Sequence, residues 1–355
     1  MKKNFATIYA ILCALTMFAG FFLVFLFAYK AGLQETILGC IGLFLGLIFA
    51  PIVHELGHVA FAKGMQMECI FIKCFCFKMF FKDGKRKCGF ASPFASDQTQ
   101  TLPKRGGNMQ NRAEWYTLGG LIFGGAFLLI LFVLALVFTG IGNTKYLLWG
   151  MIPYTAYLFF LNLLPLHYPT GKTDTLVYKG IVKGYDAEKT MLSAMEIFGQ
   201  LYEGKSFCEI DRELYFDLPQ LCEDEPMFSV ILDLRYRYYL EKGDLQNAAD
   251  CLNRLAYAQA YLPIEECEKI GAELVYFHSI HGNITDANEC AKTCEKYLQE
   301  NNVLAKRALL AFSVSAGKTE AIEALLKQAE EALQKERLSG IRKSERILLD
   351  RLVKA

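Results

Sequence analysis

The sequence predicts an all-α membrane protein: a four-span helical bundle with a small β-hairpin at the membrane surface, followed by a cytoplasmic α-helical domain. The 355 residues are 53% hydrophobic and only 21% charged, with a mean hydropathy of +0.23. Such a composition excludes a disordered chain and disfavours an ordinary soluble enzyme. The halves also differ in charge. Residues 1–174 carry 15 Lys and Arg against 7 Asp and Glu, whereas residues 175–355 carry 23 against 30. Two differently built domains are therefore expected, at 1–176 and 177–355.

Four nearly uncharged stretches in the first half are long enough to cross a bilayer as helices, which takes about 20 apolar residues. The expected spans cover about residues 4–29, 36–62, 115–142 and 146–167. The first apolar run is too long for a signal peptide. The fourth stretch contains Pro153 and Pro165, residues that disfavour a helix interior.

The distribution of basic residues predicts the orientation in the membrane. The segment from Lys63 to Arg112 holds ten Lys and Arg against three acidic residues, and the short turns between the other spans are nearly uncharged. Basic segments stay on the cytoplasmic side. We therefore expect a multi-pass protein of the cell membrane with both termini in the cytoplasm.

The basic segment divides into two parts. Residues 67–90 are rich in Phe, Ile and Cys with partial alternation, and Asp83-Gly84 is a turn signal, which predicts a β-hairpin or small sheet. Residues 91–113 are polar and contain Gly, Pro, Ser and Asn, so they are expected to form a mobile loop.

The second half has the pattern of paired amphipathic helices. Turns recur at Gly243-Asp244, Gly282-Asn283 and Gly317-Lys318, each between two apolar-periodic stretches. This resembles a short helical solenoid of the tetratricopeptide type, and a plain helical bundle is the alternative. An acidic array of this kind could bind a cytoplasmic protein or a basic peptide. It has no glycine-rich phosphate loop and no basic-aromatic stripe, so nucleic-acid binding is not expected.

The candidate metal-binding and catalytic residues lie at the end of the second span, where the sequence reads HELGH. Two histidines four residues apart, His54 and His58, lie on one face of a helix, so both imidazoles can reach one zinc ion. Glu55 is then placed to act as the general base that takes a proton from the attacking water. The plain alternative is a helix end with two surface histidines. It is disfavoured because ionisable residues inside a span are costly and are usually functional.

A catalytic zinc ion needs a third protein ligand and an open position. Asp174 is the predicted ligand, because Pro and Gly residues break the fourth span and free a carboxylate to turn back toward the metal. His167 is the reserve ligand. The remaining histidines, His278 and His281, belong to the cytoplasmic helices of the second half and are interpreted as ordinary residues of the helical solenoid.

These motifs resemble the site-2 protease family of intramembrane zinc metalloproteases, which pair HExxH on one span with an Asn-x-x-Pro motif and an Asp-Gly pair on a later one. HELGH matches fully, Asn162-Leu-Leu-Pro165 matches the second motif, and the third span begins with the glycine-rich WYTLGGLIFGG. In two departures, the gap to Asp174 is longer and Thr175 replaces the glycine. The resemblance covers residues 36–176.

The resemblance implies a metalloendopeptidase with one Zn²⁺ per chain, held by His54, His58 and Asp174, with Glu55 as the catalytic base. Asn162 would position the substrate or stabilise the oxyanion. Substrates would be transmembrane or signal-peptide segments, which must unwind before cleavage, and the 67–90 hairpin would offer an edge to the unwound strand or cap the bundle.

Two other readings remain. The chain could be a catalytically inactive scaffold or receptor whose helical array binds a partner, although the intact HELGH motif favours an enzyme. It could also be another HExxH membrane protease, similar to the prenyl-protein proteases. That class requires a glutamate ligand from a later helix, and no glutamate lies between Glu114 and Glu188.

Overall fold

The structure is a computed structural model that describes residues 2–82, 85–92, 97–140, 142–168 and 171–354. It is mostly helical. Two compact units are distinguished by their internal contacts. The first comprises Met1–Phe80, Arg86–Leu102 and Gln110–Tyr185, and the second Phe81–Lys85, Pro103–Met109 and Asp186–Ala355. The main division of the chain therefore falls between Tyr185 and Asp186.

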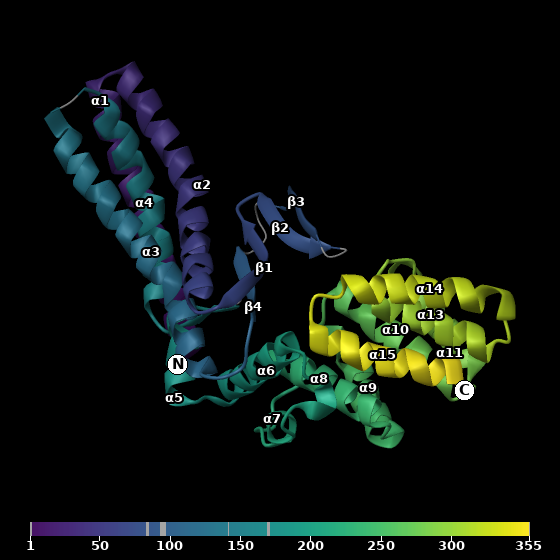
Figure 1. Cartoon of the computed structure of the whole chain (residues 1–355). Helices are drawn as coiled ribbons and strands as arrows, with labels where there is room; N and C mark the ends of the chain where they lie inside the picture. The colour runs from purple at the N-terminus through teal and green to yellow at the C-terminus, as the bar shows by residue number, and fades with distance from the viewer. Residues whose placement is uncertain (1, 83–84, 93–96, 141, 169–170, 355) are drawn as a thin grey trace. The chain divides into compact units, whose positions relative to one another are not determined.

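Four long helices form most of the first unit and run side by side in Figure 1. They are α1 (Lys2–Ala31), α2 (Leu33–Gly64), α3 (Met109–Val137) and α4 (Thr144–Leu163). All four are long and apolar enough to cross a membrane. Large apolar side chains such as Phe22 and Leu129 are exposed on them, as expected of surfaces that face lipid. The four predicted stretches are thus confirmed as apolar helices, which indicates a membrane protein.

The fourth helix is shorter than expected. It ends at Leu163, whereas the sequence suggested a span to residue 167. Pro165 explains the difference, because proline has no N–H to donate and disfavours the helical conformation in the residue before it. Leu164 is accordingly extended, with ψ 145°. The chain then forms a small hairpin, β5 (His167–Tyr168) with β6 (Gly171–Lys172), and enters α5 (Asp174–Lys183).

Glycines bring the helix backbones into direct contact. A Cβ atom added at Gly42 of α2 would collide with the backbone of Leu147 in α4, and one added at Gly150 of α4 would collide with the backbone of Gly39 in α2. Small residues at such crossings are typical of membrane helix packing, because they let two backbones approach closely. This contact fixes α2, which carries HELGH, against α4, which leads to Asp174.

A four-stranded sheet follows α2. Its strands are β1 (Met67–Cys74), β2 (Phe77–Lys82), β3 (Lys85–Phe90) and β4 (Gln98–Pro103), in the order β3-β2-β1-β4. β1 and β2 are antiparallel, with Phe71 opposite Phe80. The predicted β-structure over 67–90 is confirmed, although the turn residues Asp83 and Gly84 lie outside the described residues.

The prediction of a loop throughout 91–113 is wrong for Gln98–Pro103, which form β4, and for the residues from Met109 on, where α3 begins. The sequence QTQTLP is polar and has little hydrophobic alternation, so nothing local indicates a strand. Pairing with β1 decides its conformation instead, which is a tertiary effect that overrides local preference.

The second unit is built of helices. The pairs α8 (Pro226–Lys242) with α9 (Leu245–Ala258), α10 (Ile264–Ile280) with α11 (Ile284–Thr293), and α13 (Val303–Ser315) with α14 (Thr319–Lys335) pack as hairpins. The predicted turns are present. Gly243, Gly282 and Gly317 have φ values of 82°, 72° and 67°, a left-handed conformation that favours glycine. Paired helices are therefore confirmed, whereas the tetratricopeptide type stays a hypothesis.

Gly150 offers a test of the α2–α4 contact. The change Gly150→Ala should destabilise the first unit, since overpacking a close contact costs about 1–3 kcal/mol. The readout is the midpoint of thermal unfolding in detergent. Gly64→Ala is the matched control, because no atom lies within 4 Å of its added Cβ. Equal midpoints for the two variants would contradict the close contact.

Candidate metal centre

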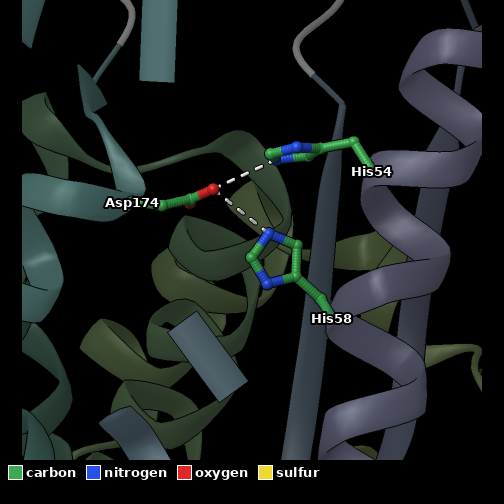
Figure 2. A group of neighbouring side chains, drawn as sticks. All are labelled: His54, His58 and Asp174. Atoms are coloured by element: carbon green, nitrogen blue, oxygen red, sulfur yellow. Dashed lines mark ion pairs between the residues drawn. The ribbon is translucent and has the colours of Figure 1, made fainter. Parts of the chain in front are cut away.

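Three side chains from two segments distant in sequence converge in the first unit. His54 and His58 project from α2, and Asp174 reaches them from the first residue of α5, as Figure 2 shows. One ligand atom from each lies within 4.8 Å of the others, and among the described residues this is the group of His, Cys, Asp and Glu able to hold a metal. The structure therefore brings together the three ligands predicted from the sequence.

The two histidines are fixed by the close approach of α3. Both are buried, with 8% and 7% of their surface exposed. A Cβ at Gly57, between them, would collide with the backbone of Gly119 in α3, and one at Gly120 would lie 2.5 Å from His58 Nε2 and 2.7 Å from His54 Nε2. The paired glycines of α3 thus leave space for the imidazoles.

A backbone carbonyl orients His58. Its Nδ1 lies 2.8 Å from the carbonyl oxygen of Tyr116 in α3. A carbonyl can only accept a hydrogen bond, so Nδ1 is the donor, and in the neutral ring Nε2 keeps its lone pair. Metal-binding histidines typically donate their second nitrogen in this way, which fixes the ring and directs the other nitrogen to the metal.

Two threonines hold Asp174 in place at the broken end of α4. The Thr173 hydroxyl donates to the carbonyl of Leu164 at 2.8 Å and caps α5 by accepting from the Leu176 N–H. The Thr175 hydroxyl donates to the carbonyl of Asn162 at 2.6 Å. Pro165 and the extended chain after it leave these carbonyls without helical donors. Thr175 therefore helps to fix the aspartate beside it.

The carboxylate of Asp174 has the environment of a metal ligand. Its Oδ2 lies 3.1 Å from His54 Nε2 and 3.4 Å from His58 Nε2, yet this buried atom has no hydrogen-bond partner. Tetrahedral zinc with bonds of about 2.0–2.2 Å would place its ligand atoms about 3.4 Å apart. The residues therefore fit a divalent metal among them.

The charge state of Asp174 also suits a ligand. Burial raises the pKa of its carboxyl, but the two neighbouring imidazoles lower that pKa by more, so the net pKa lies well below the ordinary value. Asp174 is consequently ionised at neutral pH. An ionised oxygen and imidazole nitrogens form the mixed donor set found in catalytic zinc sites.

Glu55 lies in the same cavity but takes no part in the three-residue group. The cavity has a volume of ≈ 390 Å³, and Glu55 lines it together with the three candidate ligands and Asn162. Only 5% of the Glu55 surface is exposed. Its Oε2 accepts a hydrogen bond from the Thr99 hydroxyl at 2.6 Å. A carboxylate beside a candidate metal site can act chemically as a general base.

The other predicted residues are placed differently. Asn162 lines the cavity, and its side-chain amide donates to the carbonyl of Leu158 at 3.3 Å. His167, the reserve ligand, is exposed on β5 and does not join the group. Thr99, Tyr116 and Thr173 were not predicted from the sequence. Only Thr173 had a local signal, as a threonine at the start of a helix after the Pro and Gly residues.

Gly120 tests the geometry of the group. Gly120→Ala should prevent metal binding, because its Cβ would occupy the space between the two imidazoles. Gly124→Ala is the matched control on the same helix, since its Cβ would lie 3.8 Å from His54 Nδ1, an ordinary contact. Metal per purified chain, measured by plasma mass spectrometry, should fall to near zero in the first variant only. Full metal content in Gly120→Ala would refute the convergence.

Comparisons with known proteins add no further identification. No protein-family model, no curated protein and no solved structure matches the chain. The function must therefore be inferred from the residues of the site and from the fold that holds them.

Proposed function

We propose that the chain is an intramembrane zinc metalloendopeptidase of the site-2 protease type, which hydrolyses peptide bonds in or near transmembrane or signal-peptide segments. The observation that carries the proposal is the convergence of His54, His58 and Asp174 beside a buried Glu55. Two imidazoles, one carboxylate and a nearby glutamate form a complete set for metal-assisted hydrolysis.

The proposed site lies within the apolar region. His58 and His54 precede the end of α2 at Gly64, by about 9 and 15 Å at 1.5 Å per residue. With the basic segment on the cytoplasmic side, the site would lie below the cytoplasmic surface of the membrane, and both termini would be cytoplasmic. A substrate bond at this depth would belong to a membrane-embedded segment.

Each residue then has a role. His54, His58 and Asp174 would hold a zinc ion, which supplies a Lewis acid that lowers the pKa of water and polarises a carbonyl. Glu55 accepts a proton from the attacking water and returns it to the leaving amide nitrogen. Asn162, in the wall of the same cavity, is placed to hold the substrate backbone or donate to the oxyanion.

The substrate must be extended at the site, because the carbonyls of a helix are already hydrogen-bonded. The sheet can support this conformation, since β4 is its edge strand and the first residues of β4 line the cavity. An extended peptide can add to such an edge. The helical hairpins of the second unit would recruit or regulate substrates as a tetratricopeptide-like array.

Metal content tests the ligand set. Purified protein should hold about one zinc per chain, and the double change His54→Ala/His58→Ala should abolish binding. Asp174→Ala should weaken zinc retention, because it removes the anionic ligand, whereas the exposed His167→Ala serves as the matched control and should not. The reverse result, with His167→Ala deficient and Asp174→Ala normal, would overturn the assignment of Asp174.

Glu55→Gln separates catalysis from metal binding. The variant should keep its zinc but lose cleavage, because an amide cannot accept the proton. Comparative membrane proteomics of cells with wild type or Glu55→Gln should then reveal a membrane peptide that persists only with the variant. Identical peptide profiles, with zinc bound in both, would favour the scaffold interpretation.

A further inference from the structure

Glu55 is held by a residue from outside the HELGH helix. Its Oε2 accepts a hydrogen bond from Thr99 Oγ1 at 2.6 Å, within the range of a hydroxyl bound to a charged carboxylate. Thr99 belongs to β4, 44 residues along the chain from Glu55. The sequence motif by itself therefore does not determine how the carboxylate of Glu55 is oriented.

Thr99 is itself fixed at two points. Its backbone carbonyl accepts a hydrogen bond from the Tyr116 hydroxyl at 2.5 Å. Two residues earlier, Asp97 Oδ1 lies 2.8 Å from Lys73 Nζ and accepts from the Phe75 N–H at 2.7 Å. Lys73 is only 3% exposed, so this ion pair is shielded from solvent on its basic side. The start of β4 is consequently anchored both to β1 and to α3.

Tyr116 links the base to a metal ligand. Its hydroxyl donates to Thr99, and its main-chain carbonyl accepts from His58 Nδ1 at 2.8 Å. Hydrogen-bonded contacts thus run from Glu55 through Thr99 and Tyr116 to His58, across α2, β4 and α3. A catalytic group must be held within a fraction of an ångström of its productive position, and such supporting contacts provide that precision.

We propose that Thr99 is a positioning residue for the endopeptidase reaction: its hydroxyl holds Glu55 through Oε2 and leaves Oε1 as the oxygen that accepts the proton. This inference rests on the proposed function. It assigns β4 a role in catalysis as well as in substrate contact, because displacement of the strand would release the general base. Neither the HELGH motif nor the Asn-x-x-Pro motif contains this residue.

The test compares Thr99→Val, which keeps the shape but removes the hydroxyl, with Thr99→Ser, which keeps the hydroxyl. Fluorescein-labelled casein serves as an unstructured probe substrate for the full chain in detergent. Thr99→Val should lower kcat about 10- to 100-fold with little change in KM or zinc content, because misplacement of a catalytic group costs rate. Thr99→Ser should restore most of kcat. Thr16→Val makes the same change at an exposed position of α1, outside the cavity, where the hydroxyl donates to the carbonyl of Leu12, and it should behave as wild type.

A second measurement does not depend on activity. The infrared difference spectrum between each protein and its Glu55→Gln counterpart isolates the carboxylate bands of Glu55. These bands should shift in Thr99→Val and return in Thr99→Ser. Unshifted bands, or an unchanged kcat of Thr99→Val in an active enzyme, would overturn the inference. If the wild type binds zinc but cleaves nothing, while the bands still shift in Thr99→Val, the positioning contact is upheld. The proposed function is then refuted instead.

Discussion

The central constraint is an ionised carboxylate oxygen facing two imidazole nitrogens inside an apolar helical bundle. Asp174 Oδ2 lies within 3.4 Å of both Nε2 atoms without a hydrogen bond to satisfy it. A buried charge in this position is costly unless a cation or a proton balances it. The rest of the first unit can be understood as the framework that holds these groups together despite the free-energy cost of burying the charge.

That framework works by close backbone approach and by a broken helix. Gly57, Gly119 and Gly120 remove the side chains that would otherwise separate α2 from α3 or fill the space between the imidazoles. At the other side, α4 stops at Leu163 so that the chain can turn and present Asp174. A continuous helix would satisfy its own carbonyls and carry the aspartate away. Because the helix breaks, the carbonyls of Asn162 and Leu164 accept hydrogen bonds from the hydroxyls of Thr175 and Thr173 instead.

The sequence alone was sufficient to predict the features that depend on residues close together in the chain. Span length and hydropathy predicted four apolar helices, and the spacing of His54 and His58 predicted their common face. Asp174 was predicted because Pro and Gly residues break the end of the last span, as Pro165 does, whereas Pro153 lies inside α4. Thr99 and Tyr116 were not predicted, since their roles arise only when β4 pairs with β1 and α3 crosses α2. Such contacts join residues far apart in sequence, where periodicity carries no information.

Thr175 shows how a hydroxyl next to the aspartate can fix the chain around it. The hydroxyl of Thr175 donates to the carbonyl of Asn162. Together with Thr173 it ties the first turn of α5 to the last turn of α4 on both sides of the aspartate. These hydroxyl contacts, rather than the length of the segment after Pro165, therefore set where the aspartate lies.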